Sequence, residues 1–256
     1  MKRFLSLLLI AAGCGGQPNV ESLGWLAMGT TAQISFKTSD GPSTIAEGHA
    51  FGAVKDVFED VERKLSIWRP DSEISRYVSL DAVSPEMRPC YEAAFALQRS
   101  SGGAFNPFWR GAGKGPDLGA IAKGFAVDLA AERLTRDGGP GRDMLIDLGG
   151  NLKAVRGVWR VGIRDPSRSG EIVRAIALTN GMACATSGEY ERGKHIRDGR
   201  TGAAVSNNVA SVTVVHPSSA MIADGLSTTL FVLGRDKGQA FLEKHHPEAS
   251  AYWVMR

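Results

Sequence analysis

Apolar residues recur at helical spacing in several stretches of the chain. In the first, Val54, Phe58, Val61 and Leu65 fall on one face of a helix that Ser43 or Thr44 can cap. Capping residues and glycine or proline breakers bound the other expected helices. These run from Ser84-Pro85 to Gly102-Gly103, from about Ala120 to Arg136, from a Ser219 cap to about Leu233, and onward from an Asp236 cap.

Short β patterns occur in the remaining sequence. They are expected at Thr31–Thr38, Met144–Leu148, Val158–Ile163, Ile172–Thr179, Met182–Thr186, Val209–Val215 and Ala251–Met255. Several of these strands follow one another without an intervening helix, which argues against a doubly wound parallel sheet. The pattern predicts an α+β fold in which mixed or antiparallel sheets are packed by helices.

The N-terminus has the pattern of an export signal. Lys2 and Arg3 precede a short apolar run, and small residues lead to Cys14. Cys14 after Ala-Ala-Gly is similar to the lipidation site of bacterial lipoproteins, although Ala11 stands where leucine is usual. We therefore expect a signal peptide over 1–13, a lipid-anchor tether over 14–24 and one domain over 25–256. The expected location is the periplasmic face of a bacterial membrane; simple secretion and a chance apolar start on a cytoplasmic chain are the alternatives.

Charge and cysteine content limit the possible partners and metals. The formal net charge is +3, and removal of Lys2 and Arg3 leaves 3 − 2 = +1, so no nucleic-acid partner is expected. Cys90 lies in a helical pattern and Cys184 in a strand pattern. We expect two buried free thiols, with a disulfide as the alternative open to an exported protein. The spacing typical of a zinc site is missing from the sequence.

Two segments carry the chemistry. Asp117-Leu118-Gly119-Ala120-Ile121-Ala122-Lys123-Gly124 leads into a helix and places a lysine at its N-terminus, where phosphate groups bind well. The segment Ala223-Asp224-Gly225-Leu226-Ser227-Thr228-Thr229 lies inside another helix. There Asp224 and Thr228 share a face, and hard oxygen ligands of this kind suit Mg²⁺ with substrate phosphates. Together the segments predict a Mg²⁺-dependent site for a diphosphate.

A series of motifs in one order resembles the bacterial FAD:protein FMN transferase family, the ApbE-like flavin transferases. The matching stretches are Met28-Gly29-Thr30, Leu65-Ser66-Ile67-Trp68 with Ser72–Arg76, Gly103-Ala104-Phe105, Asp117–Gly124, Asp147–Asn151, Trp159–Pro166, Ala185–Gly188, His195–Gly202 and Ala223–Gly234. The resemblance implies that FAD and Mg²⁺ are bound and that a Thr or Ser hydroxyl of an exported acceptor protein takes FMN through a phosphoester bond. AMP would be released.

The resemblance also implies residue roles. The metal ligands would be Asp224, Thr228 and the backbone carbonyl of Ala120, with Ser227 as an alternative to Thr228. His195 is the candidate general base, because a neutral imidazole can take a proton near pH 7. The cofactor-binding residues implied are Met28, Trp68, Ala104, Phe105, Asp117 and Lys123. Asn106 and Arg197 depart from the family pattern but are further candidates, because an amide can hydrogen-bond the cofactor and a guanidinium can lie near the phosphates.

Structural roles compete with several of these assignments. Trp68 and Met28 could be core residues, Asp117 a helix N-cap, Lys123 a solvated helix lysine, and His195 a structural histidine. Three of the other four histidines, His216 after a strand and His245 and His246 near the C-terminus, carry no motif.

Three departures from the family pattern bear on the expected activity. Only residues 106–116 separate the Gly-x-Phe and Asp-Leu-Gly segments, where the family has a longer stretch. Asn106 replaces the usual aspartate, and Arg197-Asp198-Gly199 replaces Ile-Asp-Pro. Two alternatives therefore stay open: a Mg²⁺-dependent FAD pyrophosphatase that yields FMN and AMP, and a periplasmic lipoprotein that binds flavin without chemistry.

Overall fold

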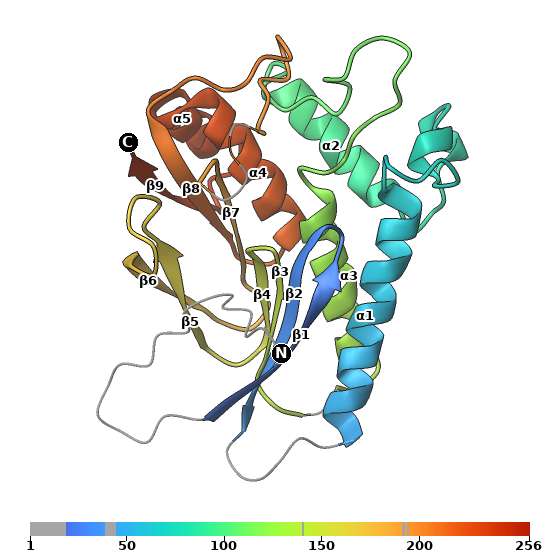
Figure 1. Cartoon of the computed structure of the whole chain (residues 1–256), viewed down its shortest axis with the longest axis vertical. Helices are drawn as coiled ribbons and strands as arrows, with labels where there is room; N and C mark the ends of the chain where they lie inside the picture. Colours follow the sequence, from blue (N-terminus) through green and yellow to red (C-terminus); the bar gives the residue numbers. More distant parts are fainter. Residues whose placement is uncertain (1–18, 39–44, 140, 191–192, 194) are drawn as a thin grey trace.

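A seven-stranded antiparallel sheet forms the centre of the protein, in the strand order β1-β2-β3-β4-β7-β8-β9 (Figure 1). This computed structural model describes residues 19–38, 45–139, 141–190, 193 and 195–256. The strands are β1 Asn19–Ala27, β2 Thr30–Thr38, β3 Met144–Leu148, β4 Asn151–Arg156, β7 Ala183–Gly188, β8 Val209–His216 and β9 Ser250–Met255. A separate hairpin pairs β5 (Trp159–Arg164) with β6 (Ile172–Leu178).

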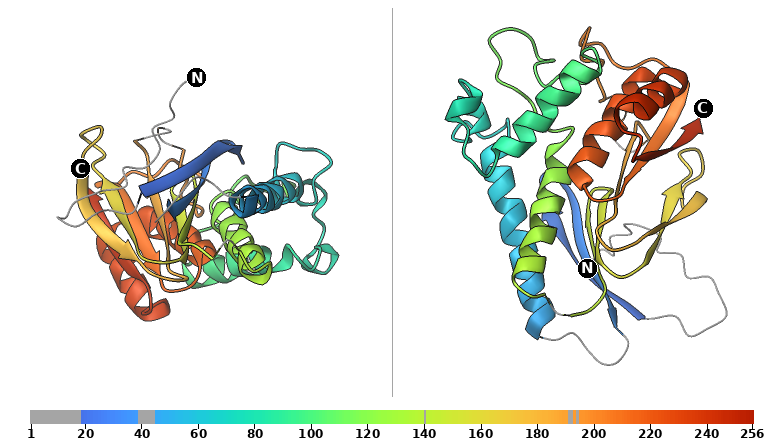
Figure 2. Two further views of the ribbon diagram at one scale, coloured as in Figure 1. Left: turned by 90° about the horizontal axis from the view of Figure 1, so that it is seen from below. Right: turned by 180° about the vertical axis from the view of Figure 1, so that it is seen from behind.

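Helices cover one face of this sheet, and the β5–β6 hairpin covers the other. The helices are α1 Ile45–Leu65, α2 Arg88–Ser100, α3 Ala122–Arg136, α4 Ala220–Leu233 and α5 Arg235–His245. The view from behind in Figure 2 shows them in front of the sheet. Helices and antiparallel strands segregate in this way in α+β proteins, so the predicted fold class is confirmed. Within the described residues, no helix combines the length and apolar character needed to cross a bilayer.

The core has two parts because the strands alternate between the two faces. On β3, Met144 and Ile146 join the large core beneath the helices, whereas Leu145 joins a smaller core beneath the hairpin. Trp159 is fully buried in the smaller core. Both faces of the central strands are therefore closed to solvent, which holds their ends in fixed positions.

The tether expected over residues 14–24 is corrected in part by the structure. Residues 19–24 belong to β1, which pairs along its whole length with β2. The prediction failed because β1 is an edge strand whose side chains are mostly exposed, so it lacks the apolar alternation of a buried strand. The signal peptide, Cys14, and the Ser43 and Thr44 caps lie outside the described residues.

Strand β4 was missed for a different reason. Asn151 and Lys153 occupy its helix-facing positions, where apolar residues are expected. Both are buried, and each has a polar partner: Asn151 Nδ2 donates to the Leu148 carbonyl at 3.0 Å, and Lys153 Nζ donates to Asp128 Oδ1 at 2.6 Å. Partners supplied by tertiary structure allow polar residues at positions that period-2 patterning reserves for apolar ones.

Three helices begin later or differently than the sequence predicts. Helix α2 starts at Arg88, so the proline in its first turn is Pro89 and not Pro85. Helix α3 starts at Ala122 instead of Ala120, and the residue before α5 is Gly234, with Asp236 inside the first turn. The Ser219 cap of α4 is confirmed: its hydroxyl accepts a hydrogen bond from Ile222 N at 3.1 Å.

The two described cysteines are free and buried, as expected. Cys90 lies in α2 and Cys184 in β7. Burial in apolar surroundings raises the pKa of the Cys184 thiol to about 12. A thiol with so high a pKa is unreactive near neutral pH.

The junction between α3 and α4 is built on Asp128. Its carboxylate accepts hydrogen bonds from Ser219 Oγ at 2.7 Å, from the backbone amides of Ala220 and Met221 at 2.9 and 3.0 Å, and from Lys153. A carboxylate is favourable at a helix N-terminus, where the first N–H groups lack intrahelical partners. This contact fixes the start of α4 against α3.

His216 makes the same junction sensitive to pH. Its Nδ1 accepts hydrogen bonds from the backbone amides of Ser218 and Ser219 at 3.2 and 2.9 Å, so this nitrogen must be unprotonated. Burial lowers the pKa of His216 below its ordinary value of 6.5, although the Glu248 carboxylate, 3.5 Å from Nε2, opposes this shift.

We therefore expect the His216 contribution to stability to be present above pH 6.5 and to diminish as the pH falls below that value. The unfolded chain binds the proton more readily than the folded chain in this range, which favours unfolding. Urea denaturation between about pH 7.5 and pH 5.5 checks this, with His216→Asn as the comparison because an amide oxygen accepts without titrating. An identical pH dependence in both proteins would contradict the assignment.

Candidate functional site

A cavity of about 660 Å³ lies at the ends of α3, α4 and the central strands, and its volume falls in the range of small-molecule sites. All twelve site residues predicted from the sequence line it, although they come from distant parts of the chain. They are Met28, Trp68, Ala104, Phe105, Asn106, Asp117, Ala120, Lys123, His195, Arg197, Asp224 and Thr228. The structure thus brings these residues together in one place.

Close approach of α3 and α4 sets the position of Asp224. Gly124 permits this approach, because a Cβ atom built there would lie 2.1 Å from the Ala220 carbonyl oxygen and 2.8 Å from Asp224 Cβ. The Gly124 amide donates to Asp224 Oδ2 at 3.0 Å. The first turn of α3 therefore binds a carboxylate from α4, an arrangement that the helix dipole favours.

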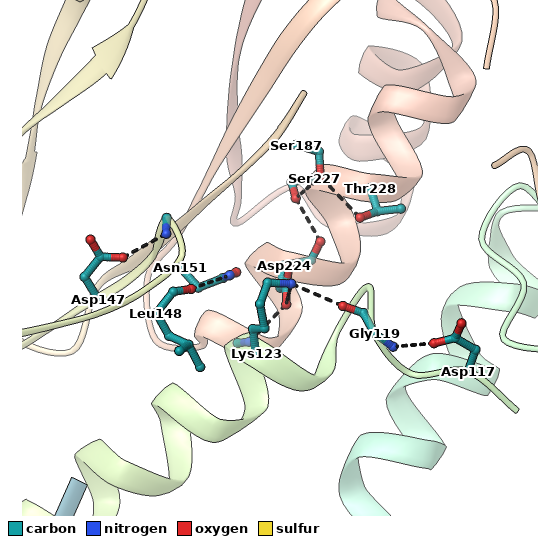
Figure 3. A network of polar contacts seen from close by, with 12 residues as sticks. Asp117, Gly119, Lys123, Asp147, Leu148, Asn151, Ser187, Asp224, Ser227 and Thr228 are labelled. Atoms are coloured by element: carbon teal, nitrogen blue, oxygen red, sulfur yellow. Dashed lines mark hydrogen bonds and ion pairs between the residues drawn. The ribbon is translucent and has the colours of Figure 1, made fainter. Parts of the chain in front are cut away.

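Asp224 is a buried carboxylate with few partners. Burial raises its pKa, while the Lys123 ammonium and the Gly124 amide oppose that rise. The distance from Lys123 Nζ to Asp224 Oδ2 is 3.5 Å, which makes this a long ion pair (Figure 3). A buried charge normally requires close pairing or a metal. Asp224 therefore favours the binding of a further cation.

The hydroxyl group of Thr228 is held near Asp224 by a small network (Figure 3). Ser187 Oγ, from β7, lies 3.2 Å from Thr228 Oγ1 and 2.8 Å from Ser227 Oγ. Ser227 is fully buried, and its hydroxyl donates to the Asp224 carbonyl at 2.9 Å. Of the two hydroxyls, only that of Thr228 belongs to a residue that lines the cavity, which favours Thr228 over Ser227 as a ligand.

These oxygens form a donor set that fits Mg²⁺ better than a transition metal. Asp224 and Thr228 face the same cavity as Ala120. The Gly124 amide bonds to Asp224 instead of extending the helix back to Ala120, which leaves the Ala120 carbonyl free of that helical bond. No group of three or more His, Cys, Asp or Glu side chains suited to a metal occurs in the described part of the chain. A metal here would complete its shell with water and substrate oxygens.

Lys123 lies in the first turn of α3, and Asp117 lies in the loop that precedes this helix (Figure 3). Lys123 Nζ also donates to the Gly119 carbonyl at 3.2 Å. Asp117 is not the helix N-cap, since α3 begins five residues later; its carboxylate accepts from Gly119 N at 2.9 Å and from Trp109 Nε1 at 3.2 Å. Asp117 thus orients the loop that leads to the lysine.

Aromatic and thioether side chains border another part of the cavity. Trp68 is 88% exposed, so it is not the core tryptophan that the sequence left possible, and its indole face is open to a planar ligand. Met28 occupies the β1–β2 turn with φ of 49°, followed by Gly29 at 69°. Positive φ is uncommon for methionine and costs energy, which is typical of functional sites. The Met28 amide donates to Glu62 Oε2 at 3.0 Å, which fixes the turn.

Asn106 has a mainly structural set of contacts. Its Oδ1 accepts from Gln98 Nε2 and from Phe108 N, both at 2.9 Å, and its Nδ2 donates to the Gly199 carbonyl at 2.8 Å. These bonds tie the loop that carries Ala104 and Phe105 to the loop that carries Arg197. At most one amide hydrogen remains for a ligand.

His195 is exposed and borders the cavity near Arg197. Its Nδ1 lies 2.8 Å from the Gly193 carbonyl oxygen. A carbonyl only accepts hydrogen bonds, so Nδ1 carries the hydrogen and the neutral ring presents Nε2 as an acceptor. This tautomer is the one that a general base using Nε2 requires. His245 and His246 do not line the cavity, and neither does His216.

Sequence reasoning missed several residues that shape this site. Ser187, Thr186, Glu62 and Asn151 all line the cavity. Ser187 and Asn151 lie inside motifs that match the family pattern, and this match is the feature of the sequence that could have indicated a place in the site. Their roles depend on contacts between strands and helices, which sequence spacing does not specify.

Comparison with known proteins identifies the family. Residues 28–114 and 109–253 match the sequence model of the ApbE family, and the two matched stretches meet where the chain is shortened. The FAD:protein FMN transferase of Haemophilus influenzae is 29% identical over 98% of this chain and 91% of its own length. The protein of the same name from Treponema pallidum is 30% identical over 97% and 88%, respectively.

A solved structure shows the same fold. The apo form of the Pseudomonas stutzeri flavinyl transferase ApbE is 26% identical and superimposes with a TM-score of 0.72, over 94% of this chain and 92% of that one. The α+β fold of this chain is therefore the fold of that structure. The chain belongs to the ApbE family.

Proposed function

We propose that this protein is a Mg²⁺-dependent FAD:protein FMN transferase that attaches FMN to a Thr or Ser of an exported acceptor protein and releases AMP. The observation that carries the proposal is the buried Asp224 carboxylate, placed with Thr228 and Lys123 in the cavity that Trp68 borders. This combination provides one region for phosphates and a metal, and another for a flat ring system. The names of the relatives support the same activity.

In this proposal, FAD occupies the whole cavity. Trp68 and Met28 contact the isoalloxazine ring, and Ala104 and Phe105 form part of the wall beside it. Lys123 and Arg197 supply positive charge toward the diphosphate, and Asp117 holds the loop before Lys123 in place through Gly119. Asp224, Thr228 and the Ala120 carbonyl hold the metal.

A Mg²⁺ ion held by these residues would withdraw charge from the phosphate oxygens of the diphosphate. The protein then aligns the nucleophile. His195 Nε2 accepts the proton of the acceptor hydroxyl as its oxygen forms a bond to the FMN-side phosphorus. The bond from that phosphorus to the bridging oxygen breaks, and AMP leaves with this oxygen. Positioning and charge neutralisation account for most of the catalysis in such phosphoryl transfers.

One experiment separates this proposal from its two alternatives. The protein lacking residues up to Cys14 is incubated with FAD, with Mg²⁺ or with EDTA, and with or without an acceptor domain. AMP release and covalent flavin fluorescence on the acceptor are measured together. Labelling that requires Mg²⁺ supports the transferase. AMP without labelling identifies an FAD pyrophosphatase, and bound FAD with neither signal identifies a flavin-binding protein without this chemistry.

We also propose that Cys14 anchors the enzyme to the periplasmic face of the membrane. Four residues separate Cys14 from the start of β1 at Asn19. A chain of this length spans at most about 18 Å, so the domain would stay close to the lipid surface. This places the cavity within reach of acceptors that are themselves held at the membrane.

Replacing Cys14 with serine is expected to release the mature protein from the membrane fraction. The change removes the thiol that carries the lipid and leaves the domain unaltered. Cell fractionation followed by immunoblotting checks the result. The control is mass spectrometry of the wild-type N-terminus, which should carry the added mass of the lipid. A variant that stays membrane-bound to the same extent would contradict the anchor.

A further inference from the structure

Asn151 contains a buried acceptor that lacks a partner. The residue is 2% exposed and lines the cavity. Its Nδ2 donates to the Leu148 carbonyl at 3.0 Å, which fixes the amide orientation because a carbonyl cannot donate. Oδ1 is fully covered and has no hydrogen-bond partner among the residues that the structure describes. Buried acceptors are nearly always satisfied, so this oxygen requires an explanation.

Asn151 lies opposite the first turn of α3. Asn151 and Lys153 share the helix-facing side of β4, about 6.7 Å apart along the strand. Lys153 contacts Asp128 of α3, and Asp128 lies five residues after Lys123, a rise of about 7.5 Å along the helix. The two distances are similar, so Asn151 on β4 and Lys123 on α3 lie at about the same height along these neighbouring elements. Figure 3 shows the amide oxygen on the side of the Lys123–Asp224 pair.

Lys123 is the candidate donor for this oxygen, because it lies at the same level on the facing helix. Its ammonium has three hydrogens, but its contacts to Gly119 and Asp224 are long, at 3.2 and 3.5 Å. It also contacts Asp224 Oδ2, one of the two carboxylate oxygens of the proposed metal ligand. A divalent cation at Asp224 would repel the ammonium strongly in a buried setting, and Lys123 would have to move.

We propose that Lys123 has two positions, and that Asn151 Oδ1 is the acceptor for the second. Without a metal the ammonium neutralises Asp224; when a divalent cation binds Asp224, the ammonium moves to Asn151 Oδ1 and stays in the cavity beside the phosphates. This inference rests on the metal assignment in the proposed function. In this proposal the donor to Oδ1 is a neighbouring side chain that changes position. Asn151 is therefore a positioning residue that lets the metal and the lysine be bound together.

A double-mutant cycle tests this with metal binding as the readout. Mn²⁺ affinity is measured by electron paramagnetic resonance, alone and with ADP, which has no flavin to transfer. Asn151→Leu is expected to weaken Mn²⁺ binding about tenfold, the lower range for loss of an outer-shell partner. In a Lys123→Met background, where no ammonium has to be moved, the same change should have no effect. Equal weakening in both backgrounds, or no weakening in either, would overturn the proposal.

Control variants separate this inference from the proposed function. Asp224→Asn should abolish Mn²⁺ binding; if it does not, the metal assignment itself fails. Asn207→Leu removes an amide whose two groups already bond to Phe231 and Val209, away from the cavity, and should leave Mn²⁺ affinity unchanged. If Asn151→Leu does not fold, a crystal structure of the wild type with Mn²⁺ and ADP decides. Lys123 Nζ hydrogen-bonded to Asn151 Oδ1 supports the proposal, and Nζ still on Asp224 beside the metal refutes it.

Discussion

Replacing Asp224 with alanine is expected to abolish Mg²⁺-dependent cleavage of FAD while leaving the protein folded. Asp224 is the only carboxylate in the proposed donor set, so its loss leaves two neutral oxygens to hold the metal. The metal is worth several kcal/mol of transition-state stabilisation, so we expect AMP release to fall by about three orders of magnitude. Folding should survive because Asp224 is a desolvated charge, and Lys123, whose side chain is partly exposed, can reach solvent.

The measurement is AMP release as a function of Mg²⁺ concentration, together with thermal unfolding followed by circular dichroism. Asp236→Ala is the matched control, since Asp236 is an exposed residue in the first turn of α5 outside the cavity. It should leave turnover unchanged. Wild-type turnover in Asp224→Ala would rule out the metal assignment.

Replacing Gly124 with alanine is expected to be strongly destabilising, although alanine is the better helix former. The new methyl carbon would lie 2.1 Å from the Ala220 carbonyl oxygen, so α3 and α4 would have to separate. Overpacking of this kind costs about 3 kcal/mol or more when backbone atoms must move. The separation would also carry Asp224 away from the Gly124 amide and should weaken metal binding.

Chemical denaturation of the wild type and Gly124→Ala gives the difference in the free energy of unfolding. Gly48→Ala is the control: Gly48 is exposed in α1, and a Cβ there would meet nothing within 4 Å. That change should raise stability by up to about 1 kcal/mol, from helix propensity alone. If both variants were stabilised, the close helix approach would not be the reason for glycine at position 124.

Much of the candidate site could be predicted because its residues lie in short motifs with local geometry. Asp224 and Thr228 are one helical turn apart, so helical spacing places them on the same face. Lys123 follows a loop that leads into a helix, which places it near the helix N-terminus. The order of the motifs then linked segments that are distant in the sequence. The structure places all twelve residues on one cavity, while their individual roles remain predictions.

The features that could not be predicted depend on tertiary contacts. β4 carries Asn151 and Lys153 toward the helices, and Asp128, the Ser218 carbonyl and the β3–β4 turn supply the polar partners that make this possible. Asn106 was expected to contact the cofactor, yet its amide mostly joins two loops. Asp117 was open to a capping role, but the helix starts too late for it. In each case a correct prediction requires knowing which polar groups form hydrogen bonds with each other in the folded protein.

The most direct test of the proposed function is the intact mass of an acceptor domain after incubation with this protein, FAD and Mg²⁺. We expect a mass gain of one FMN less one water, located on a Thr or Ser by peptide mapping and lost when EDTA is present. AMP release together with an acceptor of unchanged mass, using an acceptor that an enzyme of the same family does label, would contradict it.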